Sequence, residues 1–184
     1  MSGPNVPPGP PEPTGGASDG RVPTPGRLAD RVAIEDLATA YAYAVDDRDW
    51  VRWEALFLPD AHIDYTAAGG IAGSPAELAA WMPDAMAAFT VYLHTTTTHE
   101  IRFTDDDHAT GRVHVFNRNG LEWDGKQEVV DVSAVYHDTY LRVGGAWRFA
   151  SRVERTTFLV GGAFAAIVRD IAATGSADGH RPFG

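Results

Sequence analysis

The chain has 184 residues, of which 44% are hydrophobic, so it is long enough for one domain with a substantial core. Its formal net charge of −10 argues against nucleic acid or an anionic membrane surface as a partner, because both attract a basic patch. The absence of cysteine excludes disulfides, thiolate metal sites and cysteine nucleophiles.

The two ends of the chain differ in composition from its centre. Residues 1–26 are rich in proline and glycine and hold almost nothing to bury, so a disordered leader is expected there. A folded domain is expected over residues 27–172, followed by a flexible tail at 173–184. The sequence shows neither the blocks of a signal peptide nor an apolar run long enough to span a bilayer, so a cytoplasmic protein is expected.

Helices are predicted in the first half of the domain. Asp49 is a suitable N-cap for a short second helix, and "SPAE" (74–77) has the pattern of a capping box that starts a third helix. Pro83 should break or kink that helix before Phe89. Apolar residues at spacings of three and four give the first helix one buried face, which consists of Ile34, Leu37, Ala38, Tyr41, Ala44 and Val45.

The second half of the domain predicts strands. β-Branched and aromatic residues alternate with polar ones, and the dipeptides at 119–120 and 124–125 are both of the type that forms hairpin tips. Strands are expected at 61–67, 91–103, 109–118, 127–143 and 146–158, and a final helix at 164–171. This order predicts an α+β domain with N-terminal helices packed on one face of a strongly curved antiparallel sheet, and a cavity between the two.

Three segments carry a resemblance to a known family: "AVDDRDWVRWEALFLPDAHIDY" (44–65), "YLHTTTTHEI" (92–101) and "YHDTYLRVGGAWRFASRVERTTF" (136–158). They resemble the SnoaL-like branch of the NTF2-like superfamily, and within it the scytalone dehydratases and bile acid 7α-dehydratases. The resemblance covers about residues 27–160 and implies the NTF2-like, or cystatin-like, cone. The superfamily hosts isomerases, dehydratases, cyclases, hydroxylases and binding modules, so the fold alone does not fix a reaction.

The resemblance also implies which residues face the cavity. It makes Asp46 the cavity carboxylate, His94 its histidine partner, and Tyr41 and Tyr65 the phenols that hold substrate oxygens. Two positions depart from the scytalone dehydratase pattern. Asn119 stands near the position of a second histidine, and Tyr136 near that of a pocket asparagine. These departures place a fungal naphthol substrate in doubt.

The helical wheel and strand alternation leave some of these assignments open. Asp46 falls on the flank of the apolar helix face, whereas Asp47 lies nearly opposite it and is expected in solvent. Regular alternation would put His94 and His99 on opposite faces of one strand, and a bulge would change that parity. His94 is the preferred candidate. Opposite faces are unsuited to a shared ion, and no metal site is expected.

These residues together suggest a cofactor-independent acid–base enzyme. Asp46, His94 and Tyr41 are the expected catalytic residues. Small apolar or aromatic substrates are expected to bind against Tyr65, Asn117, Tyr136, Trp53 and Phe89. The most favoured reaction is dehydration of a hydroxylated polycyclic polyketide or steroid-like compound, with isomerisation or cyclisation as alternatives.

A non-catalytic ligand-binding module is the alternative of a different class. It would leave Asp46 and His94 beyond hydrogen-bond distance or separately satisfied. In either case the convex face of the sheet is expected to form a homodimer or a higher homo-oligomer.

Overall fold

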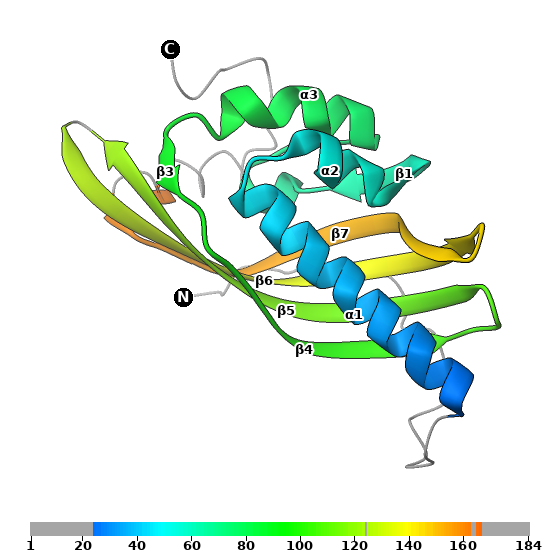
Figure 1. Cartoon of the computed structure of the whole chain (residues 1–184). Helices are drawn as coiled ribbons and strands as arrows, with labels where there is room; N and C mark the ends of the chain where they lie inside the picture. Colours follow the sequence, from blue (N-terminus) through cyan, green and yellow to red (C-terminus); the bar gives the residue numbers. More distant parts are fainter. Residues whose placement is uncertain (1–23, 124, 163–164, 167–184) are drawn as a thin grey trace, which may run out of the picture.

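A computed structural model of the chain describes residues 24–123, 125–162 and 165–166. Two α-helices come first, a third follows two strands, and long strands complete the described part of the chain (Figure 1). The elements are α1 (Pro25–Asp46), α2 (Trp50–Ala55), β1 (Phe57–Asp64), the 3-10 helix η1 (Thr66–Ala68), β2 (Ala72–Gly73), α3 (Pro75–Ala85), β3 (Phe89–Val91), β4 (His94–Phe103), β5 (His108–Trp123), β6 (Lys126–Val143) and β7 (Ala146–Val160).

The helix signals of the sequence are confirmed. Asp49 caps α2 by accepting a hydrogen bond from the backbone N–H of Arg52 at 2.9 Å. Ser74 and Glu77 form the expected capping box at the start of α3, and this helix ends two residues after Pro83. The apolar residues predicted for the first helix are all buried in α1. None of the helices among the described residues is long and apolar enough to cross a membrane.

The first helix begins slightly before the domain boundary expected at residue 27. Helix α1 starts at Pro25, because Thr24 caps it through its side chain and proline is favoured at the first helical position. The rest of the predicted leader, most of the predicted final helix and the predicted tail lie outside the described residues.

The seven strands form one sheet with the order β2-β1-β7-β6-β5-β3, and β4 also pairs with β5. The sheet is mixed and not wholly antiparallel, because β1 pairs with β7 in parallel. This parallel pair arises because α2 returns the chain to the sheet edge at Phe57, beside Phe149. The remaining pairs are antiparallel, as expected.

The β5–β6 hairpin corrects one turn assignment. Asn119 and Gly120, expected in the hairpin tip, are strand residues that pair with Val130 and Val129. The two strands stay paired out to Trp123 and Lys126, so the first dipeptide does not lie at the turn. The side chain of Asn119 therefore belongs to a face of the sheet.

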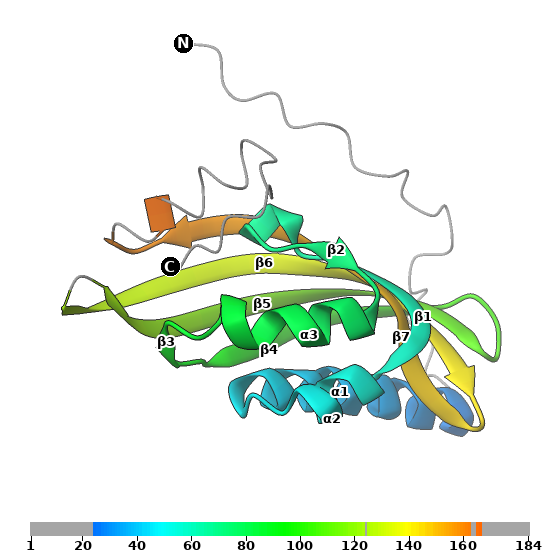
Figure 2. The ribbon, with the colours of Figure 1, turned by 90° about the horizontal axis from the view of Figure 1, so that it is seen from above.

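The helices cover one face of the curved sheet, as the views in Figures 1 and 2 show. Helix α1 crosses β4 and β7, and α3 packs near β1. The core between these layers is largely aromatic, with Trp53, Phe57 and Phe149 buried beside Tyr41. At the end of α1 and under α3 the core opens into a cavity.

Candidate active site

Asp46 and His94 are in direct contact. Asp46 is the last residue of α1, and its Oδ1 lies 2.6 Å from Nδ1 of His94, the first residue of β4. Both carboxylate oxygens also accept from the backbone N–H of His94 at 3.1 Å. The His94 side chain is only 7% exposed and that of Asp46 only 17%. The carboxylate therefore fixes both the position and the hydrogen-bonding direction of the imidazole.

A bulge in β4 decides which way the histidines face. His94 pairs with Asn117, but His99 pairs with Val113, so the register shifts by one residue across Thr97–Thr98. One extra residue exchanges the two faces of a strand. Both histidines consequently face the helices although they are five residues apart.

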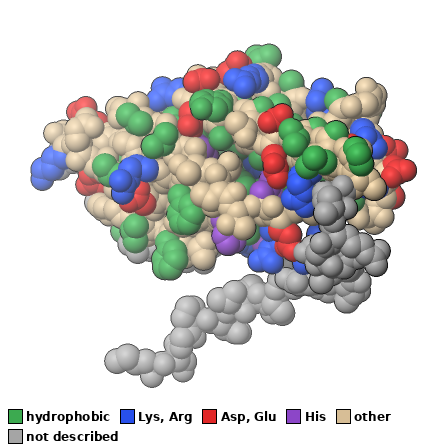
Figure 3. Space-filling view, turned by 60° about the horizontal axis from the view of Figure 1, so that its bottom comes forward, with side chains coloured by type: hydrophobic (Ala, Val, Ile, Leu, Met, Phe, Trp, Pro, Cys, Tyr) green, Lys and Arg blue, Asp and Glu red, His purple; other side chains and the backbone are tan. Residues whose placement is uncertain are grey.

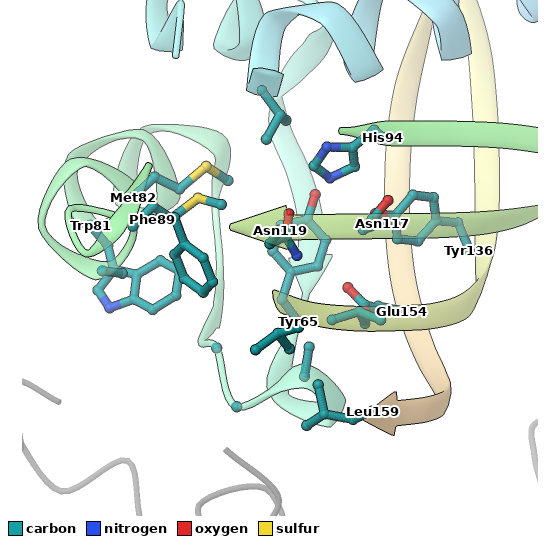
Figure 4. Close-up of a pocket in the computed structure, with 18 of the residues that line it drawn as sticks. Tyr65, Trp81, Met82, Phe89, His94, Asn117, Asn119, Tyr136, Glu154 and Leu159 are labelled. Atoms are coloured by element: carbon teal, nitrogen blue, oxygen red, sulfur yellow. The ribbon is translucent and has the colours of Figure 1, made fainter. Parts of the chain in front are cut away.

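The cavity has a volume of about 190 Å³ and is bounded by α1, α3 and strands β3 to β7. His94 lines it, with Asn117, Asn119, Tyr136 and Glu154 on the sheet side and Trp81, Met82 and Phe89 on the other side (Figure 4). Tyr41, Tyr65 and Phe89 lie in its wall as the sequence indicated.

Trp53 does not line the cavity, contrary to the sequence-based expectation. It is fully buried behind Tyr41 and stacks on Phe57 with ring centroids 4.7 Å apart. The reason is that α2 is only six residues long, and its inward face is used to close the core against β1. Trp53 supports the cavity wall and does not contact a ligand there.

Two phenols are joined at the cavity wall. The hydroxyls of Tyr41 and Tyr65 lie 2.7 Å apart. Burial raises the pKa of Tyr65 well above its usual range, and the neighbouring Tyr41 adds to the effect. Burial likewise raises the pKa of Tyr136, so Tyr65 and Tyr136 are neutral hydrogen-bond donors around neutral pH. One of the two hydroxyls donates its hydrogen to the other, so the hydrogen of the second hydroxyl is left to donate to a ligand.

A buried ion pair supports these rings from below and was not recognised in the sequence. Arg152 makes two hydrogen bonds of 2.8 Å to Asp138, and its guanidinium stacks 4.0 Å from the Tyr41 ring centroid and 4.2 Å from that of Tyr136. Burial disfavours the charge on Arg152, but the Asp138 carboxylate outweighs it and raises the pKa well above its usual range. Arg152 is thus a fixed cation behind the phenols.

His99 belongs to this ion-pair network and not to the cavity. Its Nε2 lies 3.1 Å from the Tyr140 hydroxyl, which donates to Asp138 at 2.8 Å. Burial lowers the pKa of His99 to about 4, against the opposing effect of Asp138. Gly111 on the adjacent strand leaves the necessary space, because a Cβ there would lie 2.6 Å from the Tyr140 oxygen. The structure therefore places His94, and not His99, beside the cavity.

The cavity also presents unused hydrogen-bond acceptors. Asn117 and Asn119 are each 8% exposed, and neither amide oxygen has a partner among the described residues. Asn117 lies close enough to Tyr136 to lower the pKa of that phenol, against the larger effect of burial. Buried acceptors without partners are unfavourable unless a ligand or water supplies a donor. This pair of amides is therefore suited to bind hydroxyl groups.

Glu154 is the remaining titratable side chain of the cavity wall, and sequence reasoning missed it. It is 6% exposed, and its Oε1 accepts from the Thr156 hydroxyl at 3.2 Å. Burial raises its pKa from 4.5 to about 7. Alternation along "RVERT" puts Arg152, Glu154 and Thr156 on one face, which was the available signal.

Known proteins share this architecture. The family model for the SnoaL-like domain matches residues 26–153. An uncharacterised protein of Mycobacterium tuberculosis is 34% identical over 131 residues, which are 71% of this chain and 88% of the relative. The γ-hexachlorocyclohexane dehydrochlorinase of Sphingobium indicum is 29% identical over 132 residues, covering 72% of this chain and 83% of that enzyme.

Solved structures agree with the sequence matches. A type 3 hexachlorocyclohexane dehydrochlorinase of Novosphingobium barchaimii has a TM-score of 0.65 and 26% identity, over 75% of this chain and 93% of the other. A scytalone dehydratase-like protein of Novosphingobium aromaticivorans has a TM-score of 0.65, at 23% identity over 73% and 89% of the two chains, and shows the shared fold. The expected α+β cone is confirmed, and the relatives include a lyase. The chain belongs to the SnoaL-like domain family of the NTF2-like superfamily.

Proposed function

We propose that the protein is a cofactor-independent lyase that removes a proton from a carbon beside a carbonyl and expels a leaving group from the next carbon. The contact of 2.6 Å between Asp46 and His94 is the observation that carries this proposal. A carboxylate at Nδ1 holds the hydrogen on that nitrogen and leaves Nε2 free to act as a base. His94 lines the cavity, so its free nitrogen is available to a bound ligand.

The tyrosines are placed to stabilise the intermediate. When the proton leaves, negative charge develops on the carbonyl oxygen of the substrate. The hydroxyl hydrogen that Tyr41 and Tyr65 do not share can donate to that oxygen, with Tyr136 or Asn117 assisting. The Arg152 guanidinium behind the rings favours negative charge at this end of the cavity. The arrangement needs no redox group and no bound nucleophile.

The cavity limits the size of the substrate. Its volume of about 190 Å³ compares with the cavity of about 150 Å³ that holds benzene in an engineered protein. A compound of one or two rings suits this space better than a four-ring steroid. Hydroxyl substituents on the ring would pair with the free amide oxygens of Asn117 and Asn119. The proposed substrate is therefore a compact hydroxylated aromatic or alicyclic ketone.

The alternatives differ in what they predict for the same cavity. An isomerase or cyclase would begin with the same proton removal and release no leaving group. A non-catalytic binding module gives no reason for Asp46 and His94 to be paired, and their short contact favours an enzyme. The dehydrochlorinase named among the relatives also favours elimination as the reaction class.

The test follows elimination from a β-hydroxy tetralone, a two-ring ketone whose dehydration gives a naphthol that is detected by its absorbance. His94→Ala should lower the turnover by about 100- to 10,000-fold, because general acid–base catalysis is typically worth that much. His108→Ala is the matched control, since His108 is an exposed residue at the start of β5. Equal activity of the His94 variant and the wild-type protein would contradict the proposal.

The proposal includes self-association through the outer face of the sheet. Phe116, Phe158 and Val160 are more than half exposed there, next to Leu93. Exposed apolar groups that cluster on one face are typical of protein interfaces. A second copy of the chain is the expected occupant, in agreement with the oligomer suggested by the sequence.

A further inference from the structure

Glu154 is an isolated carboxyl group at the side of the cavity formed by β7. Among the described residues it forms no ion pair. Arg152 is bonded through Nε and Nη2 to the two oxygens of Asp138, and its Nη1 has no hydrogen-bond partner there. Its hydrogen-bond partner is the neutral hydroxyl of Thr156. Most of the other cavity groups near Glu154 are neutral or apolar, including Tyr136 and Leu159. A negative charge on the carboxyl is therefore only partly compensated by these surroundings.

The proton state of Glu154 follows from this environment. Desolvation by burial raises its pKa from 4.5 to about 7, and the Asp64 carboxylate acts in the same direction. Thr156 and Arg152 lower the pKa and only partly offset the burial. Below pH 7, Glu154 is therefore largely a neutral acid that can give up a proton, and near pH 7 about half of the molecules carry that proton.

The position of Glu154 is opposite that of the base. Glu154 comes from β7 and His94 from β4, and β5 and β6 lie between these strands. Three strand spacings correspond to roughly 14 Å between the backbones, and the curvature of the sheet brings the side chains closer together. In the view of Figure 4, Asn117 and Asn119 lie between His94 and Glu154. A substrate held by the two amides, with the bond between its two reacting carbons placed in this space, would thus have a base on one side of that bond and an acid on the other.

We propose that Glu154 is the acid that protonates the departing hydroxyl group of the substrate, so that the elimination uses two proton-transfer groups on opposite sides of the ligand. This role rests on the lyase function proposed above. His94 Nε2 takes the proton from carbon, the electrons of that C–H bond form the new C=C bond, and the C–O bond breaks. Glu154 gives its proton to the departing oxygen, which leaves as water.

The cycle closes without another reactant. After elimination the His94 imidazolium carries one extra proton and Glu154 lacks one, so transfer of that proton through the released water restores both groups. Hydroxide is a poor leaving group and needs this acid, whereas chloride leaves as an anion and does not. The role of Glu154 therefore predicts an effect that depends on the leaving group.

The experiment compares β-hydroxy and β-chloro forms of one tetralone, which lose water and hydrogen chloride respectively and give the same naphthol. Glu154→Gln keeps the shape of the side chain but cannot donate an acidic proton. We expect it to slow the hydroxy probe by about 100-fold or more and the chloro probe by less than about threefold. Glu100→Gln, a half-exposed carboxyl on the same sheet, is the matched control.

The outcomes separate the two levels of the proposal. Equal slowing of both probes by Glu154→Gln would contradict the role as leaving-group acid, because it would indicate binding or oxyanion stabilisation. No slowing of either probe would also contradict it. If His94→Ala leaves the rate with both probes unchanged, or the wild-type protein converts neither, the lyase proposal itself fails. Slower turnover of the hydroxy probe alone in Glu154→Gln, with partial recovery in Glu154→Asp, would support the role of Glu154 as the leaving-group acid.

Discussion

Asp46 and the adjacent Asp47 differ in what they contact. Asp46 is bonded to the ring and backbone of His94, whereas the Asp47 side chain is 63% exposed and lies 3.9 Å from Arg52. Asp46→Asn replaces one acceptor oxygen by a donor, which favours the wrong hydrogen position on the imidazole. We expect turnover of the hydroxy tetralone to fall by about 100- to 10,000-fold, and Asp47→Asn to leave it unchanged. Comparable activities of the two variants would contradict the role of the pair.

Glu154 also sets a pH dependence of stability. Its pKa is about 7 in the folded protein and 4.5 as the reference value, so the folded state binds more protons between these values. Stability contributed by this group is therefore fully present below pH 4.5 and is lost as the pH rises through 7. As the pH rises through this range, the free energy of unfolding of Glu154→Gln should decrease by roughly 1 to 3 kcal/mol less than that of the wild-type protein. Urea unfolding of both proteins at pH 5 and pH 8 measures this difference. An equal change in the free energy of unfolding of the two proteins would contradict the prediction.

His99 has the opposite effect on the pH dependence of stability. Its folded pKa of about 4 lies below the reference value of 6.5, because burial disfavours the imidazolium. The stability it contributes is fully present above pH 6.5 and is lost as the pH falls towards 4. His99→Gln should reduce the acid sensitivity of unfolding between these values. If the free energy of unfolding of the variant falls as steeply between pH 6.5 and pH 4 as that of the wild-type protein, groups other than His99 cause the acid sensitivity.

The individual residues were predictable to different degrees. Asp46, His94 and Tyr41 followed from the resemblance, since helical periodicity alone left Asp46 at the flank of the apolar face. Glu154 and Arg152 were missed because a charged residue in a strand normally indicates solvent exposure. Only the paired strands show that these two side chains face inward.

At the scale of elements, the bulge in β4 brings both histidines to the same face. Deletion of Thr98 should remove the extra residue and turn either His94 or His99 towards the outer face. We expect loss of turnover if His94 turns, or a loss of stability if His99 turns and leaves Tyr140 without its partner. Thr98→Ala, which keeps the residue count, is the control. Wild-type activity and stability of the deletion variant would contradict this role of the bulge.

Local signals predicted the helices well and the sheet less completely. The caps at Asp49 and Ser74 depend on neighbouring residues, so the sequence is sufficient to locate them. The parallel pairing of β1 with β7 joins residues about ninety positions apart and has no local signature. Asn119 was assigned to a turn because its dipeptide is typical of hairpins, and continued pairing with β6 overrides that preference.

At the scale of the whole molecule, acidic and basic side chains are interspersed on the face shown in Figure 3. The outer face of the sheet carries the exposed aromatic residues Phe116 and Phe158 beside the Arg118–Asp131 ion pair. Phe158→Asp should therefore shift the protein from an oligomer to a monomer without changing the core. Light scattering coupled to size-exclusion chromatography gives the mass of each form. A monomeric wild-type protein would contradict the interface.

The central claim is that the Asp46–His94 pair removes a proton from a ligand bound in the cavity. The most direct measurement follows exchange of the hydrogens next to the carbonyl of an unsubstituted tetralone in D2O by NMR, since this probe has no leaving group. We expect the wild-type protein to catalyse the exchange, Asp46→Asn to slow it, and His94→Ala to abolish it. Exchange at the wild-type rate in His94→Ala, or none in the wild-type protein, would contradict the account.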